Sequence, residues 1–214
     1  MMSAPWIMLD GLLLYGMGEL LFGRAWQTMA SSSDRAMWAA IPLPVDTVPG
    51  KSPPIYHASC SRFDAPSVAS TSFFQHFSTE NIGDLSSDAL KQRYMIVGGE
   101  FKQSSKTYPV ISSKSVKFWC HGDAKLITTI ISAMPGIGKK LDVGYGRILF
   151  SHIDKTRVTW AIIHPEYGLN RPIPLEWASK NGFVCGNPVA TVAFSPPYWM
   201  QEHHEPCYVP GGFA

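Results

Sequence analysis

The spacing of apolar positions changes near the start of the chain. Residues 6–10 form a short apolar run that predicts a buried strand, and from residue 12 the spacing becomes helical, predicting a helix to about residue 29. Residues 5–22 are apolar enough to resemble a membrane segment, but Asp10 and Glu19 interrupt them, and carboxylates are costly in lipid. We therefore expect a core strand followed by a core helix, and no membrane segment.

The middle of the chain mixes strand-like and polar segments. Residues 55–60 alternate as a half-buried strand does, whereas residues 67–90, rich in Ser, Thr, Asn and Asp, predict an insertion with little regular structure. Two more strands are predicted at 93–101 and 109–120. The polar, basic residues 102–107 between them predict a hairpin tip.

A helix, a glycine-rich loop and further strands complete the predicted core. Asp123 offers an N-cap for a helix whose apolar positions share one face, and Pro135 ends it. Residues 136–147 follow with four glycines, and two strands are predicted at 147–153 and 157–163.

The order of these elements predicts an α+β fold with a ferredoxin-like, or split βαβ, core. We expect a domain over residues 1–165, with an insertion at about 62–90 and the hairpin at about 93–120. Residues 166–214, rich in proline and aromatic residues, predict an extension packed on the same core, with a short strand near 189–194 and otherwise irregular structure.

Composition excludes several classes of protein. The chain has 214 residues, 45% of them hydrophobic and 16% charged, which is typical of a globular protein rather than a disordered one. Four cysteines without a CxxC pair exclude a zinc ribbon. The neighbouring His203 and His204 would point in opposite directions in an extended segment. We therefore expect no metal and no cofactor.

Positive charge is concentrated in one part of the chain. Residues 91–157 contain twelve of the eighteen Lys and Arg residues and four of the sixteen acidic ones, a formal charge of +8, which leaves −6 elsewhere. A basic half in a nearly neutral chain is typical of a protein that binds a polyanion.

The glycine-rich loop lies within this basic region and carries Lys139, Lys140 and Arg147. Glycines let successive backbone N–H groups approach an anion. The loop matches neither a Walker A motif nor a dinucleotide-binding fingerprint. Two interpretations remain open: a glycine-rich turn with solvated lysines, or a site for the phosphate backbone of RNA or DNA.

No catalytic motif is present. The chain lacks GxSxG and HExxH motifs and a convincing pair of carboxylates. His57, His121 and His152 are candidates for a general base in RNA cleavage, but the sequence gives none of them an obvious orienting partner. We therefore expect no enzyme.

Three segments resemble the RAMP (repeat-associated mysterious protein) superfamily of CRISPR proteins. PWIMLDGLLLYGMG is similar to its first strand and helix, GIGKKLDVGYGRI to its glycine-rich loop, and VGGEFKQSSKTYPV to a hairpin of the type IV CRISPR effector subunit that holds the 5′ handle of the guide RNA. The resemblance covers roughly residues 5–160 and implies a modified RNA-recognition-motif fold.

The resemblance also implies a function. The chain would be a non-catalytic, cytoplasmic RNA-binding subunit of a CRISPR ribonucleoprotein in antiviral defence, capping the guide-RNA filament beside a backbone RAMP subunit and a large subunit. Contact with target DNA beside the protospacer stays open. The RNA-binding residues implied by position are Lys102, Lys106, Tyr108, Gly136, Gly138, Lys139, Lys140, Gly144, Tyr145, Gly146 and Arg147.

Two alternatives remain. Some RAMP proteins are metal-independent endoribonucleases that process CRISPR repeat RNA, and such an activity would use one of the three histidines. The other alternative is a structural interaction protein whose lysines only solvate its surface, which would show no salt-dependent affinity for RNA.

Overall fold

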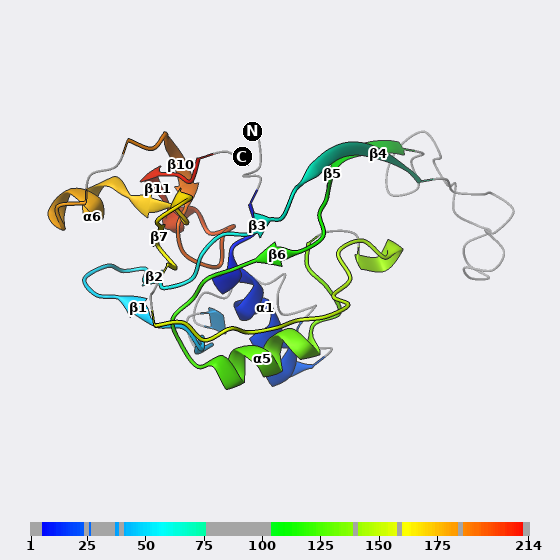
Figure 1. Ribbon diagram of the computed structural model, residues 1–214, viewed down its shortest axis with the longest axis horizontal. Helices are drawn as coiled ribbons and strands as arrows, with labels where there is room; N and C mark the ends of the chain where they lie inside the picture. Colours follow the sequence, from blue (N-terminus) through cyan, green and yellow to red (C-terminus); the bar gives the residue numbers. More distant parts are fainter. Residues whose placement is uncertain are drawn as a thin grey trace, which may run out of the picture. The chain divides into compact units, whose positions relative to one another are not determined.

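The computed structural model describes residues 6–23, 26, 37–38, 41–75, 104–138, 141–157, 160–183 and 186–211. The chain forms two compact units (Figure 1). The first unit comprises Met1–Arg62 and Val116–Ala214, and the second comprises Phe63–Ser115. Each unit is described separately below.

Two helices form one core of the first unit. α1 (Leu9–Phe22) packs against α5 (Ala124–Ala133), and Gly16 of α1 allows their close approach because a Cβ there would meet Ile130. The strand predicted at residues 6–10 is reduced to a single bridge between Met8 and Cys60, since the helix already begins at Leu9. The buried residues of this core are Leu9, Leu13, Leu14, Met17, Trp26, Trp38, Ile41, Val45, Ala58, Ile127, Ile130, Met134 and Met200.

Small antiparallel sheets make up the rest of the first unit. β1 (Thr47–Val48) pairs with β2 (Ile55–Tyr56), and β7 (Ile163–His164) pairs with β8 (Gly168–Leu169). A three-stranded sheet has the order β10-β11-β9, built from the strands β9 (Ile173–Pro174), β10 (Val189–Ala193) and β11 (His204–Tyr208).

This sheet organises the C-terminal part of the chain. β10 confirms the strand predicted near residues 189–194, but the surrounding residues are more regular than predicted, since α6 (Leu175–Lys180) and β11 were not foreseen. The second core of the unit lies here, and its buried residues are Val48, Ile55, Leu169, Ile173, Ala178, Phe194, Cys207 and Val209.

A buried ion pair connects α1 to the C-terminal part. Arg171 and Asp10 have fully buried side chains, and Arg171 Nη2 donates to Asp10 Oδ2 over 3.2 Å. The guanidinium also donates to the carbonyl oxygens of Ala58 (2.9 Å) and Phe194 (2.6 Å), while the Tyr198 hydroxyl donates to Asp10 Oδ1 (2.6 Å). The Asp10 carboxylate, which argued against a membrane segment, is thus paired with a buried cation inside the protein.

The second unit is built on a long antiparallel ribbon. β4 (Ser67–Gln75) pairs with β5 (Ser104–Ser112) along all nine residues, from Ser67↔Ser112 to Gln75↔Ser104. Two short strands, β3 (Arg62–Phe63) and β6 (Val116–Lys117), pair where the chain passes from one unit to the other and returns.

The ribbon corrects two predictions. Residues 67–75, predicted as part of an irregular insertion, form a strand because their Ser, Thr and aromatic side chains find cross-strand partners, such as Ser72 with Thr107 (2.9 Å). Residues 104–107, predicted at a hairpin tip, lie inside β5, and its partner is β4. Residues 93–101 lie outside the described part of the chain.

The strands predicted at 147–153 and 157–163 also differ from the structure. Apart from a bridge between Gly136 and Arg147, residues 147–157 form no strand, and β7 accounts only for Ile163–His164. The described elements confirm the α+β class, whereas the ferredoxin-like order remains a prediction. Within the described segments, no helix is both long enough and apolar enough to cross a membrane.

Candidate nucleic-acid interface

The glycine-rich loop follows directly from α5. The Asp123 carboxylate accepts hydrogen bonds from the backbone N–H groups of Lys125 (2.9 Å) and Leu126 (3.2 Å), which confirms the predicted N-cap. At the other end, Pro135 follows the last turn and the chain enters the loop. The loop itself contains a single 3₁₀ turn, η3 (Leu141–Val143).

Backbone contacts close the loop onto itself. Ile137 N donates to Gly146 O over 2.8 Å, and Gly144 N donates to Leu141 O over 3.0 Å. Gly146 has φ 68°, and a Cβ at this position would overlap the carbonyl oxygen of Ile137. Only glycine meets both conditions. Gly144 also has positive φ, 87°, but a Cβ there would meet no atom within 4 Å.

A pocket of about 540 Å³ opens beside the loop. Its apolar lining comes from the end of α5 and from the loop, namely Met134, Pro135, Leu141 and Ile148. Gly144, Tyr145 and Arg147, three of the residues predicted to bind RNA, complete the lining. A pocket of this size, with a ring and a guanidinium at its wall, can hold one flat, charged group such as a nucleotide.

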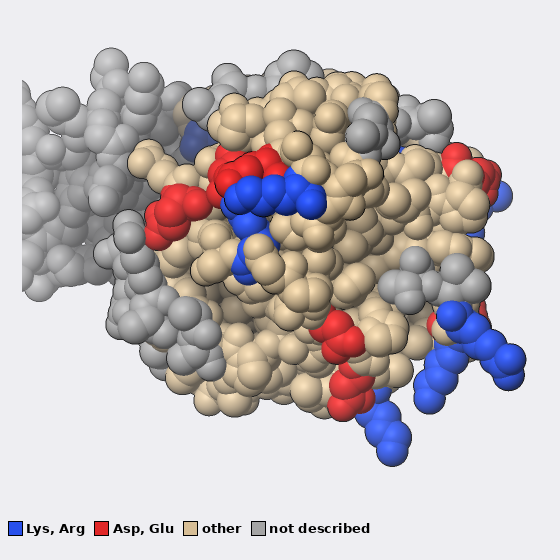
Figure 2. All heavy atoms as spheres, turned by 90° about the vertical axis from the view of Figure 1, so that its left-hand side faces the viewer, with Lys and Arg blue, Asp and Glu red and all other residues tan. Residues whose placement is uncertain are grey.

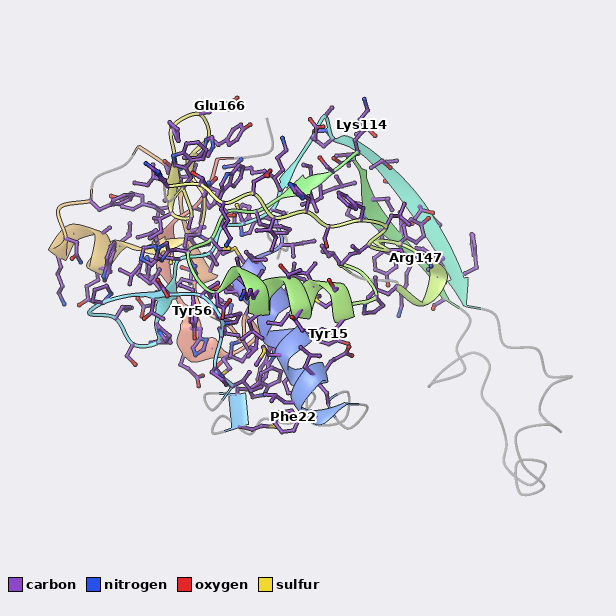
Figure 3. The ribbon with its side chains drawn as sticks, turned by 60° about the horizontal axis from the view of Figure 1, so that its bottom comes forward. Tyr15, Phe22, Tyr56, Lys114, Arg147 and Glu166 are labelled. Atoms are coloured by element: carbon purple, nitrogen blue, oxygen red, sulfur yellow. The ribbon has the colours of Figure 1, made fainter. Side chains whose placement is uncertain are left out.

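Basic side chains in residues 91–157 are exposed and unpaired in the part of the chain that the structure describes. None of them forms an ion pair or side-chain hydrogen bond there with another described residue. Figure 3 shows one of them, Arg147, beside η3 and well separated from Glu166 in the turn between β7 and β8. The described members are Lys106, Lys114, Lys117, Lys125, Arg147, Lys155 and Arg157.

Described basic residues outside this range are all engaged. Lys51 pairs with Glu205 (2.7 Å), and Lys180 pairs with Glu176 (2.6 Å). Arg171 pairs with Asp10, as above, and Arg62 donates to Asn170 and lies over the Tyr167 ring. On the face shown in Figure 2, basic and acidic side chains lie together near the centre of a largely uncharged surface, while other basic side chains project outward at its lower edge.

The other predicted RNA-binding residues fall into three groups. Lys106 and Tyr108 belong to β5 of the second unit, where Tyr108 is half-buried with its ring 5.8 Å from that of Phe73, and Lys106 is exposed. Gly136 and Gly138 begin the glycine-rich loop. Lys102, Lys139 and Lys140 lie outside the described residues.

A cluster that the sequence did not reveal joins two of the candidate histidines to a carboxylate. His121 Nδ1 hydrogen-bonds Asp46 Oδ2, and the rings of His57 and His121 lie 6.2 Å apart. Backbone hydrogen bonds hold the three together: His57 N donates to Asp46 O (2.8 Å), Asp46 N to His121 O (2.8 Å) and His121 N to His57 O (2.9 Å). Burial and the nearby His121 lower the pKa of His57, so its imidazole is neutral at neutral pH.

Three other described histidines form hydrogen bonds elsewhere in the first unit. His152 Nε2 lies 2.8 Å from Asp154 Oδ1, two residues away. His203 and His204 each hydrogen-bond a backbone carbonyl through Nδ1, that of Ser195 (2.9 Å) and of Met200 (2.8 Å). Among the described residues, no group of three or more His, Cys, Asp or Glu side chains is arranged to hold a metal ion.

Comparison with known families decides the identity. The family model for CRISPR type IV associated protein Csf3 matches residues 91–210, more than half of the chain. The chain belongs to the Csf3 family. As a Csf3 protein it is a component of a type IV CRISPR complex, and so works with other subunits.

The family match covers the second half of the chain, and α1 and the strands β1 to β4 precede it. It includes β5, α5, the glycine-rich loop and the β10-β11-β9 sheet, and it extends beyond the segments whose resemblance was seen in the sequence. It also includes all seven unpaired basic residues, whereas Asp46 and His57 precede it. No curated protein matches the chain.

Proposed function

We propose that this Csf3 protein binds the 5′ handle of the guide RNA and caps the filament of a type IV CRISPR complex, without catalysing a reaction. A backbone RAMP subunit and a large subunit are its proposed neighbours in the cytoplasm, and target DNA next to the protospacer is a further proposed contact. The proposal keeps the RAMP assignment and the RNA-binding loop from the sequence.

One observation carries the proposal. Every described basic residue inside 91–157 is exposed and lacks an ion-pair partner among the described residues. Of the described basic residues outside that range, Lys51, Arg171 and Lys180 form ion pairs, and Arg62 donates a hydrogen bond to Asn170. Unpaired cations on a surface repel one another and gain most from a polyanion. RNA supplies regularly spaced phosphates, so it satisfies several of these cations at once.

The pocket beside the glycine-rich loop supports the same role. Single-stranded RNA is recognised by splaying out unpaired bases, which stack on aromatic rings while their phosphates contact cations. Tyr145 and Arg147 lie together at the wall of a pocket of about 540 Å³. The pocket therefore offers one unpaired nucleotide both a flat partner and a charge.

The first test is to purify the chain from its host with whatever is bound and to sequence the nucleic acid. A discrete RNA with a repeat-derived 5′ end is expected. Absence of nucleic acid, or an affinity for repeat RNA that does not change with salt, would favour the interaction protein without RNA contact.

A second test measures how RNA affinity depends on salt. Arg147→Ala should reduce the steepness of the plot of log affinity against log salt concentration by about 0.7. Lys180→Ala, which removes a paired cation, is the matched control and should leave it unchanged.

The Asp46–His57–His121 cluster favours a second candidate, a metal-independent endoribonuclease acting on repeat RNA. A neutral His57 can take the proton of a ribose 2′-hydroxyl, whose oxygen attacks the adjacent phosphorus. The P–O5′ bond then breaks, and His121, held by Asp46, gives a proton to the leaving 5′-oxygen. The products are a 2′,3′-cyclic phosphate and a 5′-hydroxyl end.

Incubation with repeat RNA in EDTA separates the two candidates. The binding role predicts intact RNA with wild-type protein. Cleavage that His57→Ala and His121→Ala each abolish, and that His204→Ala leaves unchanged, would establish the endoribonuclease instead. RNA binding itself would stand in either case, because the cluster lies outside the glycine-rich loop.

A further inference from the structure

The segment that follows the glycine-rich loop is extended but unpaired. It leads from η3 toward β7 as a long trace in Figure 1. Residues 149–157 are all exposed, and the backbone of residues 149–153 makes no hydrogen bond to another described residue. A strand was predicted at residues 147–153, but no strand within the described part of the chain pairs with this segment.

One face of this segment carries two parallel rings. Side chains two residues apart in an extended chain point to the same side. The rings of Phe150 and His152 lie accordingly on one face, with centroids 6.3 Å apart and planes within 8° of parallel. Phe150 is 82% exposed, and the hydrogen bond from His152 to Asp154 fixes the orientation of the imidazole.

Cations precede and follow the ring pair along the chain, at odd-numbered positions that the same alternation places on the opposite face from the rings. Arg147 precedes it, and Lys155 and Arg157 follow it; all three are exposed and unpaired among the described residues. Exposed aromatic rings flanked by cations are the features by which proteins bind single-stranded nucleic acid, since rings stack on bases and cations contact phosphates. A protein-docking face, by contrast, is depleted of charged residues at its centre.

We propose that Phe150 and His152 form a base-stacking platform for unpaired nucleotides of the guide RNA. The platform continues the RNA path from the pocket of the glycine-rich loop, and this inference rests on the proposed RNA-binding function. The opposite face of the segment, with Leu149 89% exposed, takes no part in the stack.

The test compares Phe150→Ala with Leu149→Ala in the full chain. Leu149 is a matched control because it is equally exposed, adjacent and on the opposite face. The probe is a single-stranded RNA with the repeat-derived 5′ handle, with the fluorescent base 2-aminopurine at successive positions. Phe150→Ala should weaken binding about 5- to 150-fold, the effect of losing one base stack, and should abolish quenching of the probe at one or two positions. Phe150→Tyr should keep both.

The readouts separate the platform from simple charge and from folding. Phe150→Ala should leave the salt slope unchanged because it removes no cation, and an unchanged thermal unfolding midpoint verifies the fold. If wild-type protein binds no RNA, the proposed function fails. If wild-type protein binds RNA and Phe150→Ala binds equally well, or if Leu149→Ala and Phe150→Ala lose only association with a protein subunit, the platform is overturned while RNA binding stands.

Discussion

Arg171, beside the C-terminal sheet, and Arg147, at the glycine-rich loop, belong to regions that use positive charge differently. Arg171 is fully buried and donates hydrogen bonds to the Asp10 carboxylate and to backbone carbonyl oxygens. Arg147 is exposed and forms no ion pair with another described residue. The C-terminal region therefore uses its cation to hold its own fold, while the loop keeps its cation available for a partner.

The two regions also differ in whether their backbone N–H and C=O groups are hydrogen-bonded within the protein. The C-terminal strands are satisfied within their sheet, from Val189↔Tyr208 to Ala193↔His204. The extended segment after the loop has its backbone open to solvent over residues 149–153. Removing the buried cation of the first region should affect stability, whereas removing exposed cations of the second should affect binding. Four experiments test this division, beginning with the largest expected effect.

Arg171→Met should destabilise the protein most. The substitution leaves the Asp10 carboxylate buried without its partner, so we expect the free energy of unfolding to fall by about 3–5 kcal/mol. Chemical denaturation measures the change. Lys180→Met, which removes the cation of an exposed ion pair, should change it far less. A loss below about 1 kcal/mol for Arg171→Met would contradict the structural role of the ion pair.

Gly146→Ala and Gly144→Ala form a pair within the loop. Both positions have positive φ, which costs a residue with a Cβ about 1–2 kcal/mol. At Gly146 the Cβ also overlaps the Ile137 carbonyl, whereas at Gly144 it meets open space, so Gly146→Ala should be the more destabilising variant. Thermal unfolding of the two variants side by side gives the difference. Equal losses would show that the close approach at Gly146 costs nothing.

Lys139→Ala combined with Lys140→Ala should leave stability within about 0.5 kcal/mol of wild type. If both lysines contact phosphate, RNA affinity falls and its salt slope flattens by about 1–2 units. Fluorescence anisotropy at several salt concentrations measures both quantities. Retention of the wild-type slope would remove these lysines from the RNA site.

Acid should weaken the first unit modestly. Burial lowers the pKa of His164, which is 7% exposed and accepts hydrogen bonds at Nδ1 from the N–H groups of Glu166 and Tyr167. The unfolded chain then takes up a proton at a higher pH than the folded chain does, so stability is lost as the pH falls below the ordinary value of about 6.5. His164→Asn should flatten this dependence in denaturation curves between pH 7 and pH 5, and a variant with the wild-type slope would exclude His164 as its source.

Local signals in the sequence predicted local structure well. The Asp123 cap and the apolar face of α5 were visible because capping and helical periodicity involve residues three or four apart. β10 was likewise predicted from residues that are close together in the chain. The strand β4 was missed because its residues, rich in Ser and Thr, resemble a loop until their cross-strand partners in β5 are known.

The candidate site was predicted only in part. Residues 136–147 stood out through glycine content, and the structure adds a pocket beside them. The partnership of Asp46 with His121 joins residues 75 positions apart, and no pattern in a single sequence reveals it. The exposure of Phe150 was equally hidden, since a strand predicted from the sequence gives no sign of whether a neighbouring strand exists.

The distance between Asp10 and Arg171 along the chain also sets the timing of folding during synthesis. The two residues are separated by 161 positions, which a ribosome takes about 8–30 s to translate. Throughout that interval the nascent apolar helix carries the Asp10 carboxylate, whose buried partner Arg171 has not yet been made. The buried ion pair of the first unit can therefore form only after most of the chain has been synthesised.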